Sequence, residues 1–424
     1  LSDDGTIIAV GAPMGYYDEY KPNLSESTAT KNTRSRGGTV YVYEEDANLA
    51  WNQTAQLYSW YSGPLNKTTW WNNYNTSKDR FGHAVSLSND GKTLAVGASI
   101  HRNQFGRTHH GIGVVYEDTG SGFDRNTVAL QYASDGTSDV NSKSDTYGYS
   151  VAISGNGTVF AVGAVQEDEG GSLGRHSNLG LVRTYKKTNN TWNQLGSNIL
   201  GEADGDWSGH SVSLSDDGLT MAIGAPYNDG NQSNSGHVRV YHNTGSSNWV
   251  KYINDINGDG QDDGIYHARI SGDGRTLAVG TPYRNSNAGG VDIFFLYNDT
   301  VTYTPQMSAV EVFSLNTTNS TWELKGGSFS GENNSVEVDM NGDGNLILIG
   351  EPTYNTDTGR ARVFYYNTSS STWDLRGEQI IGANSGDKFG NSVSINKNAD
   401  FNGSPTINII VGANNGSSIY YRYS

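Results

Sequence analysis

A short phrase of small and apolar residues recurs seven times along the chain, and this repetition constrains the fold more than any other feature. Each copy has apolar residues, then a glycine, then alanine, threonine or glutamate. The copies are Ile8–Pro13, Leu94–Ala98, Phe160–Ala164, Met221–Pro226, Leu277–Pro282, Leu348–Pro352 and Ile410–Ala413. Self-similarity at a period of tens of residues is the signature of repeat architectures such as solenoids and propellers. The chain therefore reads as one repeat fold rather than as several unrelated domains.

Each copy lies inside a longer unit with the pattern of consecutive β-hairpins. Before it comes a short alternating segment and a tight acidic turn, as in Gly209–Ser215 followed by Asp216–Gly218. After it come a polar loop, a period-2 strand such as Gly236–Tyr241, and a strand led by a tryptophan such as Trp249. Acidic turns ending in glycine between alternating segments indicate hairpins, and four hairpin-connected strands per repeat make a propeller blade.

The expected fold class is therefore all-β: a seven-bladed β-propeller of four-stranded antiparallel blades. We expect residues 1–424 to form a single domain. Its repeat units run approximately over 1–80, 81–146, 147–207, 208–264, 265–332, 333–388 and 389–424. The first unit lacks its upstream strand and the last lacks a Trp-led strand. The first and last blades are therefore predicted to be incomplete in this excerpt, with strand edges open to a partner.

The composition agrees with a large closed β-fold and excludes several functional classes. The chain has 54 Gly, 26 Tyr, no Cys and a formal net charge of −16. The lack of cysteine excludes disulfides, thiolate catalysis and zinc–thiolate sites. The negative charge disfavours nucleic-acid binding, because phosphates would be repelled. No stretch approaches the ~20 apolar residues of a membrane-spanning helix, and we expect an extracellular or cell-surface location.

The repeat resembles the FG-GAP repeat family, which includes the propeller of integrin α subunits. The first half of the motif is literal at Phe81-Gly82 and Phe389-Gly390. The second half is literal at Gly11-Ala12-Pro13 and Gly224-Ala225-Pro226. The resemblance covers essentially the whole chain. It implies a propeller with calcium loops but specifies no function, because this architecture hosts many roles.

One stretch of acidic and amide residues has the spacing of a calcium loop. Asp255, Asn257, Asp259 and Asp263 stand at its first, third, fifth and ninth positions, and Gln261 at the seventh offers its backbone carbonyl. Calcium takes about six to eight hard oxygen ligands, which this spacing can wrap around one ion. Members of the resembled family carry such a loop. The alternative interpretation is a solvated acidic turn.

A second, weaker calcium candidate lies near the end of the chain. Its residues are Asp339, Asn341, Asp343 and Asn345. The ninth position of this stretch is an isoleucine, so the closing carboxylate is missing. A plain hairpin turn explains it more simply.

Three histidines are predicted to occupy equivalent places at the start of three inner strands: His83, His210 and His267. In a propeller such places ring one mouth of the axial channel, where they could bind a ligand or a metal. Hydrogen bonding among packed inner strands is the alternative. Trp70 and Trp71 belong to an aromatic insertion that suits stacking on a sugar or a protein contact, or packing onto the first blade.

Sequons for N-glycosylation are frequent, and most fall on predicted hairpins and insertions. They begin at Asn23, Asn52, Asn66, Asn75, Asn156, Asn189, Asn231, Asn298, Asn316, Asn319, Asn333, Asn367, Asn402 and Asn415. Such positions suit N-linked glycans in a secreted eukaryotic protein. In a bacterial protein they would be turn residues only.

These observations favour a secreted or cell-surface, non-enzymatic β-propeller for adhesion or extracellular structure, such as a fibre or coat subunit. It would be stabilised by Ca2+ and N-glycosylated, with extracellular proteins or glycans as partners. Its incomplete terminal blades would allow a homopolymer. No nucleophile elbow, phosphate-binding loop or HExxH motif is present, so an enzyme is not expected. Two alternatives stay open: a carbohydrate-binding, lectin-like propeller, and a hydrolase or lyase on this scaffold.

Overall fold

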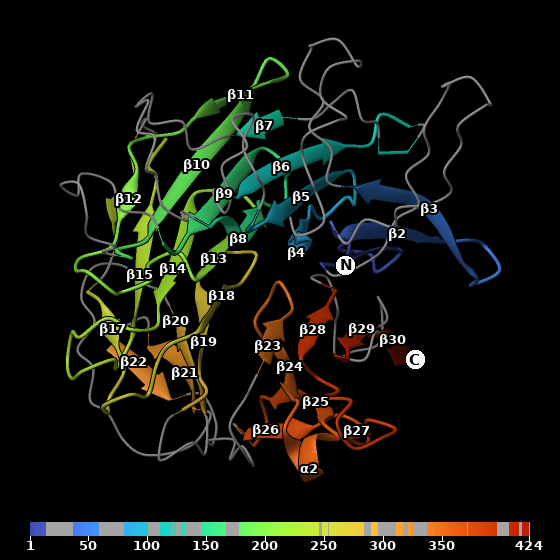
Figure 1. Cartoon of the computed structure of the whole chain (residues 1–424). Helices are drawn as coiled ribbons and strands as arrows, with labels where there is room; N and C mark the ends of the chain where they lie inside the picture. The colour runs from blue at the N-terminus through green and yellow to red at the C-terminus, as the bar shows by residue number, and fades with distance from the viewer. Residues whose placement is uncertain are drawn as a thin grey trace.

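The computed structural model is a ring of β-sheets around a central axis (Figure 1), which confirms the all-β propeller. The structure describes residues 1–13, 37–58, 80–100, 111–120, 122–123, 129–131, 146–166, 178–245, 248–252, 254–283, 290–295, 311–316, 321–324, 337–370, 372–396, 407–414 and 418–423. In most sheets the strands follow chain order from the axis outward, because each hairpin returns the chain beside its previous strand.

The first three sheets follow one another along the chain. The first holds β1 (Ile7–Ala12), β2 (Thr39–Glu45) and β3 (Trp51–Tyr58). The second holds β4 (Phe81–Leu87), β5 (Thr93–Ala98), β6 (Ile112–Glu117) and β7 (Ala129–Gln131). The third holds β8 (Tyr147–Ile153), β9 (Val159–Ala164), β10 (Leu181–Thr188), β11 (Thr191–Gln194) and β12 (Ile199–Leu200).

Four further sheets complete the ring. The fourth holds β13 (Ser211–Leu214), β14 (Thr220–Ala225), β15 (His237–His242), β16 (Val250–Lys251) and β17 (Ile256–Asn257), and the fifth holds β18 (His267–Ile270), β19 (Thr276–Thr281), β20 (Gly290–Phe295), β21 (Glu311–Asn316) and β22 (Thr321–Leu324). The sixth holds β23 (Glu337–Met340), β24 (Leu346–Glu351), β25 (Arg360–Asn367), β26 (Thr372–Leu375) and β27 (Ile380–Ile381), with the short helix α2 (Tyr354–Asp357) between β24 and β25. The last holds β28 (Ser392–Ile395), β29 (Ile407–Gly412) and β30 (Ser418–Tyr423).

The prediction of seven four-stranded blades is wrong in its detail. Five of the described sheets have four or five strands, and the two terminal sheets have three each. The extra strands β12, β17 and β27 arise because the outer edge of the third strand is shared between two short segments. For example, β10 pairs with β11 through Tyr185–Thr188 and with β12 through Leu181 and Val182. The fifth sheet departs further, because β20 and β21 pair in parallel.

The hairpin between the first and second strands of a sheet is closed by a recurring serine–aspartate pair. Ser215 Oγ donates to Asp217 Oδ1 at 2.6 Å, and the backbone N–H of Leu219 donates to the same carboxylate oxygen at 2.8 Å. The N–H of Thr220 donates to Ser215 Oγ. The same arrangement recurs at Ser2 with Asp4, Ser88 with Asp90, Ser154 with Asn156, and Ser271 with Asp273. These side chains satisfy the turn's backbone donors, as expected for aspartate and serine in tight turns.

Backbone hydrogen bonds also join the first four of these turns, each to the turn of the next sheet. The N–H of Asn156 donates to the carbonyl of Asp216 at 2.9 Å, and the N–H of Asp216 donates to the carbonyl of Gly272 at 2.8 Å. The links from Asp3 to Asn89 and from Asn89 to Gly155 continue the series. A chain of hydrogen bonds therefore runs from turn to turn at one end of the inner strands.

The hydrophobic core lies between neighbouring sheets rather than within one. One cluster joins Val40 and Val42 of β2 to Phe81, Leu94 and further residues of the next sheet. Another joins Ala95 and Val115 to Tyr147, Phe160 and Leu181. Six clusters of this kind join successive sheets along the chain, which holds these sheets together without disulfides.

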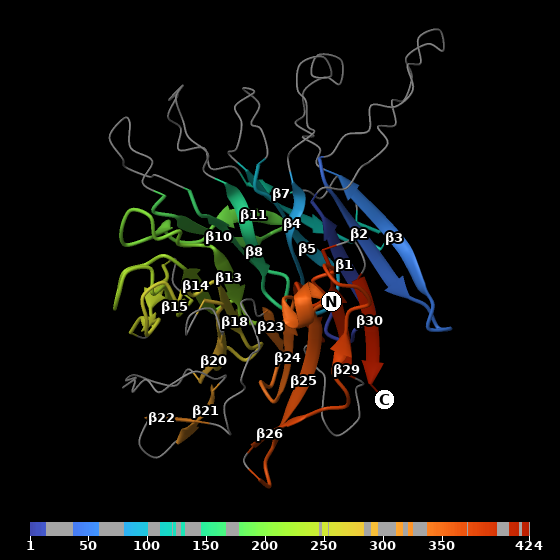
Figure 2. The ribbon, with the colours of Figure 1, turned by 60° about the horizontal axis from the view of Figure 1, so that its bottom comes forward.

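The first and last sheets meet through side chains. The indole of Trp51 packs edge-on against Tyr420 with ring centroids 5.0 Å apart, and Arg422 is ion-paired with Glu45. The two sheets lie side by side in Figure 2, where β30 runs near β1 and β2. Within the described strands, no ladder pairing joins them.

Candidate functional site

A β-bulge lies at the start of two of the inner strands, β4 and β8. In β4 the pairing register shifts between Phe81 and Ala84, and in β8 it shifts between Tyr147 and Ser150. The glycine inside each bulge has positive φ, 84° at Gly82 and 80° at Gly148. Bulges with such a glycine re-aim the side chain that follows. The residues that follow are His83 and Tyr149.

The predicted histidines do come together, with Tyr149 between two of them. The ring centroids of His83 and Tyr149 are 5.0 Å apart, and those of Tyr149 and His210 are also 5.0 Å apart. His267 lies next, with its ring 6.3 Å from that of His210. We call these four side chains the channel arc. They come from four consecutive sheets of the ring, so the fold and not local sequence assembles them.

The predicted equivalence of His267 with the other two histidines is wrong by one residue. His267 pairs with Gly280, the central glycine of its own phrase, whereas Ser211 holds that register opposite Gly224. The counterpart of His210 is therefore Tyr266. The fifth unit has Gly264-Ile265 in place of the usual FG pair, which hides this offset in the sequence.

Hydrogen bonds define the protonation of His210. Its Nδ1 lies 3.0 Å from the carbonyl oxygen of Tyr266, which can only accept, so Nδ1 carries the hydrogen. Its Nε2 then accepts from the hydroxyl of Tyr149, 3.2 Å away. Burial, and then the neighbouring His267, lower the pKa of His210 to about 3. The imidazole is therefore neutral at physiological pH.

His267 contacts a carboxyl group that was not among the predicted site residues. Its Nε2 lies 3.2 Å from Oε1 of Glu337, the first residue of β23. Burial raises the pKa of Glu337 to about 7; the charge of Arg269 opposes this rise, and that of Asp339 adds to it. Burial, and then Arg269, lower the pKa of His267 to about 3. Glu337 therefore takes up and releases its proton near neutrality beside a neutral imidazole.

A signal for Glu337 exists in the repeat itself. Ser211 and Ser213 accept backbone hydrogen bonds from Ala268 and Ile270 of the next sheet. In the sixth unit, Glu337 and Asp339 stand at these two serine positions. Asp339 still accepts such a bond, from the N–H of Ile395 at 3.0 Å. Glu337 has a longer side chain and reaches back to His267 in the preceding sheet.

Aromatic rings continue from the channel arc to one side. Trp207 and Tyr227 pack edge to face at 5.0 Å, and Tyr227 and Tyr266 follow at 5.8 Å. The hydroxyl of Tyr266 donates to that of Tyr227 at 2.6 Å, and Tyr283 lies 5.3 Å beyond Tyr266. We call these four side chains the aromatic wall. None of these four side chains was predicted as a site residue, although the Tyr-rich composition and the Trp207–His210 stretch are plain in the sequence.

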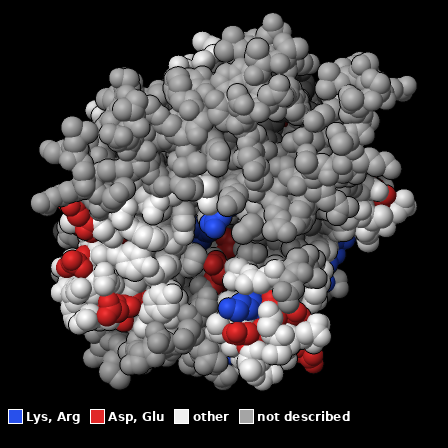
Figure 3. All heavy atoms as spheres, viewed as in Figure 1, with Lys and Arg blue, Asp and Glu red and all other residues white. Residues whose placement is uncertain are grey.

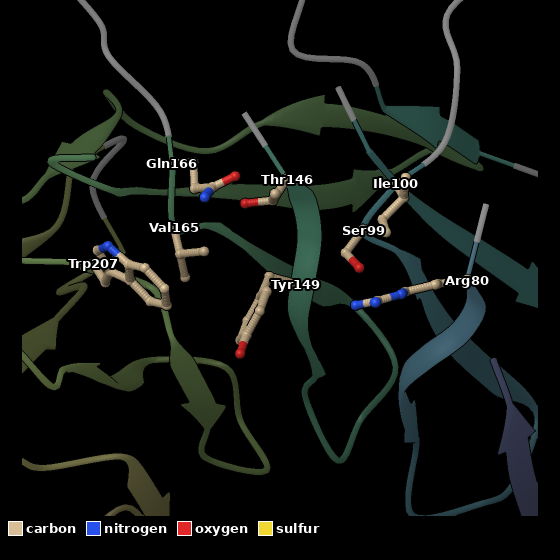
Figure 4. Close-up of a pocket in the computed structure, with 8 residues that line it drawn as sticks. All are labelled: Arg80, Ser99, Ile100, Thr146, Tyr149, Val165, Gln166 and Trp207. Carbon is tan, nitrogen blue, oxygen red and sulfur yellow. The ribbon is translucent and has the colours of Figure 1, made fainter. Parts of the chain in front are cut away.

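A hollow of about 300 Å³ opens beside the channel arc. Its lining consists of Arg80, Ser99, Ile100, Thr146, Tyr149, Val165, Gln166 and Trp207. In Figure 4, Tyr149 stands between Trp207 and Arg80, with polar groups of Thr146 and Gln166 above it. Charged side chains of both signs also lie near the centre of the face that Figure 3 draws. The hollow thus offers an aromatic face, a cation and hydroxyl and amide groups to a small polar molecule.

The predicted calcium loop is not assembled around one point. Asp255 turns to Lys251, whose Nζ lies 2.6 Å from Oδ1. Asp263 is buried, and its Oδ2 accepts from the N–H of Gly260 at 2.7 Å. Asn257 lies in β17, and the carbonyl of Asp259 accepts from Gln232. Gln261 is exposed, with Nε2 donating to Asp262. Calcium binding here stays a prediction.

The weaker calcium candidate uses its oxygens within a hairpin. Asn341 Oδ1 accepts from the N–H groups of Asn345 and Leu346 at 3.0 and 2.9 Å. Asp339 points away to the next sheet, as described above, and Asp343 lies in the turn. The structure therefore accounts for these residues as a turn, and calcium at this place also stays a prediction.

The remaining predicted site residues fall partly outside the described residues. Trp70 and Trp71 do so, as do the sequons at Asn23, Asn66, Asn75, Asn298, Asn319, Asn333, Asn402 and Asn415. Asn52, Asn156, Asn189 and Asn231 are exposed, Asn367 is half-buried, and Asn316 ends β21. Glycosylation, partner binding and polymer formation stay predictions.

Sequence comparison recognises one repeat of the chain. Residues 201–241 match the model of the FG-GAP repeat. This segment contains Ser208-Gly209, β13, β14 and most of β15, including Gly224-Ala225-Pro226. The FG-GAP repeat is therefore confirmed in this chain. None of the curated proteins matches the chain in sequence.

Solved structures share the propeller architecture at low sequence identity. The periplasmic gluconolactonase PpgL of Pseudomonas aeruginosa aligns over 91% of this chain and 85% of its own, with a TM-score of 0.50 and 15% identity. A putative 6-phosphogluconolactonase from Bacteroides uniformis ATCC 8492 aligns over 89% of this chain and 97% of its own, with a TM-score of 0.42 and 10% identity. The first of these likenesses supports the fold.

The comparison with PpgL overturns the prediction of a non-enzymatic adhesion or structural protein. The propeller that this chain follows over most of its length is, by its title, an enzyme. The expectation that the chain is not an enzyme rested on the absence of linear catalytic motifs. That reasoning was wrong, because a propeller assembles polar groups at its axis from separate repeats, as the pair of His267 and Glu337 illustrates.

Proposed function

We propose that this protein is a hydrolase that acts on a small cyclic sugar ester at the channel arc. The observation that carries the proposal is the pair formed by Glu337 and His267, 3.2 Å apart at the start of two neighbouring inner strands. A carboxyl group with a pKa of about 7 is suited to general acid–base catalysis near neutral pH. Its side chain is 22% exposed, so a bound molecule can reach it.

The surroundings of this pair suit a polyhydroxylated ring. The aromatic wall offers flat apolar faces with hydroxyl edges, the combination on which sugar rings stack. Tyr149 and His210 offer a hydroxyl and an imidazole that are already oriented by their mutual hydrogen bond. Arg80 and Arg269 supply positive charge near Tyr149 and Glu337, respectively. Positive charge stabilises both an oxyanion and a carboxylate product.

The gluconolactonase likeness suggests the reaction. In a lactone hydrolysis the oxygen of water adds to the ester carbonyl carbon, and the carboxylate of Glu337 accepts the proton that this water loses. The ring C–O bond then breaks, and protonated Glu337 returns the proton to the departing ring oxygen. The product is an open-chain hydroxy acid. Neutral His267 holds Glu337 in place in both protonation states. Its protonated ring nitrogen can donate to a carboxylate oxygen or to the carbonyl oxygen of the protonated acid.

Release of acid from glucono-δ-lactone, corrected for spontaneous hydrolysis, tests this proposal. We expect the wild-type protein to accelerate the reaction. Glu337→Gln should lower the rate of hydrolysis by at least roughly 100-fold, the contribution typical of one acid–base group. Glu378 is an exposed carboxylate after β26, so Glu378→Gln is the matched control and should retain full activity. Failure of the wild-type protein to exceed the spontaneous rate with any of a panel of aldonolactones would overturn the proposal.

A second candidate function is sugar binding without turnover, which the aromatic wall favours. Trp207, Tyr227, Tyr266 and Tyr283 form a continuous series of ring contacts beside a hollow of sugar-ring size. A glycan array and calorimetry with the lactone and its open-chain acid separate the two candidates. Saturable binding with no acid release would favour the lectin-like function. Acid release with turnover would favour the hydrolase.

An extracellular or periplasmic location fits this function. No helix in the described residues has the length and apolar character needed to cross a membrane. The aligned gluconolactonase is periplasmic by its title. Fractionation of the native source, with the protein recovered outside the cytoplasmic membrane, is the expected result.

A further inference from the structure

We propose that Glu202, His237 and Asp255 bind a transition-metal ion of the Zn2+ class that ties the third and fourth sheets together. One ligand atom from each of these three side chains lies within 4.8 Å of the other two. Glu202 follows β12 of the third sheet, whereas His237 begins β15 and Asp255 precedes β17 of the fourth. The group lies on the outer strands and contains none of the channel residues.

His237 provides the second, independent sign of a ligand. Its side chain is only 1% exposed, yet neither Nδ1 nor Nε2 has a hydrogen-bond partner. Glu202 Oε2 lies 3.9 Å from Nδ1, too far for a hydrogen bond and close enough to share an ion. A buried imidazole without any partner is costly, since both polar atoms have left water. A metal ion between these groups removes that cost.

The backbone around the three residues is fixed before any ion binds. His237 is held on both sides by strand pairing, with Ala225 on one side and Asn257 on the other. The carboxylate of Asp206 accepts from the N–H groups of Glu202 and Ala203 at 3.1 and 2.9 Å, which sets the course of the chain at Glu202. Glu202 itself is 46% exposed, so its side chain has room to move onto an ion.

The donor set selects the class of metal. One imidazole nitrogen and two carboxylate oxygens suit Zn2+ and similar ions, with a fourth position left to water. Calcium prefers about six to eight oxygen ligands and rarely takes imidazole. Asp255, the first residue of the predicted calcium loop, would therefore bind Zn2+ rather than Ca2+ in this cluster. An ion here would have to displace the ammonium group of Lys251 from Asp255, and Arg239 lies 3.8 Å from Glu202.

Titration of the tag-free, full-length protein with Zn2+, followed by calorimetry, tests the site. We expect one ion per chain and a melting temperature that rises with Zn2+ concentration, because the ion binds only the folded state. His237→Asn should weaken Zn2+ binding by more than about 100-fold. Glu202→Gln, which changes an exposed side chain, should do the same. Even loss of a residue that merely supports a ligand costs about 10–100-fold. Lys251→Met should tighten binding, since it removes the competing cation.

A histidine on the same strand gives the matched control. His242 ends β15 and contacts Thr220 instead of the cluster, so His242→Gln should bind Zn2+ like the wild type. Co2+ as a probe should give a visible ligand-field band in wild type and His242→Gln that is lost in Glu202→Gln. Equal Zn2+ affinity in wild type and Glu202→Gln would overturn the proposal. So would Ca2+ binding that matches Zn2+ and is unaffected by Lys251→Met.

Discussion

The α-carbon of Gly163 packs directly against the carbonyl oxygen of Gly209 in the next sheet, so closely that a Cβ on Gly163 would overlap that oxygen. The same relationship joins Gly11 to Gly82, Gly97 to Gly148 and Gly350 to Gly390. The first glycine of each pair belongs to the GAP half of the motif and the second to the FG half of the following repeat. The motif thus describes the contact between two inner strands of neighbouring sheets.

Replacement of Gly163 by alanine tests this contact. We expect Gly163→Ala to lower the free energy of unfolding by roughly 1–3 kcal/mol or more, because backbone cannot move aside as a side chain can. Gly224→Ala is the matched control. The nearest backbone oxygen there, that of Ile265, is 3.7 Å from the Cβ position, and the closest atom is the side-chain Oγ of Ser211. Equal losses in urea unfolding of both variants would contradict this explanation.

The pKa of Glu337 predicts the pH dependence of catalysis. Since its folded-state pKa is raised to about 7, the carboxylate that acts as base forms as pH rises through that value. The kcat/KM for lactone hydrolysis should therefore rise between pH 6 and 8 and level off above. Glu337→Gln should lose this limb. A profile in the wild type that is flat across this range would argue against Glu337 as the base.

The same group predicts a pH dependence of stability with a definite sign. The folded-state pKa of Glu337 lies above its ordinary value of 4.5, so the folded protein holds a proton that the unfolded chain releases. Its contribution to stability is fully present below about pH 4.5 and is lost as pH rises through about 7. Glu337→Gln cannot titrate. The difference in melting temperature between the variant and the wild type should therefore shift in favour of the variant from pH 5 to pH 8.

A buried ion network in the sixth sheet predicts a large loss of stability. Glu351 is fully buried and accepts from Arg360 at 2.6 and 2.9 Å and from Arg362 at 2.8 Å. Glu351→Gln removes the buried carboxylate that these two guanidinium groups share, and we expect a loss of roughly 3–5 kcal/mol in the free energy of unfolding. Asp374 is an ionised group at the surface of the same sheet, so Asp374→Asn should lower the free energy of unfolding far less. Comparable losses would show that the Glu351 network is not specially sensitive.

The hairpins could be predicted from sequence because each is a local feature. Alternating segments around Asp216–Gly218 and its counterparts fix the strands β13 and β14 and their repeats. The segments β12, β17 and β27 could not be predicted, since two residues carry no periodicity. Their pairing depends on the third strand of the same sheet having a free edge.

The site was predictable only in the part that repeats. His83 and His210 share a motif position, so their proximity follows from the ring. Glu337 escaped because its partner His267 belongs to the preceding repeat and because both deviate from the serine found at that register. The cluster of Glu202, His237 and Asp255 likewise spans two sheets. Contacts between repeats depend on the handedness and spacing of the ring, which no single repeat encodes.

Hydrogen bonds run from turn to turn, as from Asn156 to Asp216 and from Asp216 to Gly272. They limit how the repeats of such a chain can be duplicated. Together with the glycine pairs, they place half of each interaction in one repeat and half in the next. A duplicated repeat brings a matching half for both neighbours only if the boundary of the copied segment falls at the same point in every unit. Duplication in phase therefore keeps the two halves of these interactions together, whereas exchange out of phase would separate them.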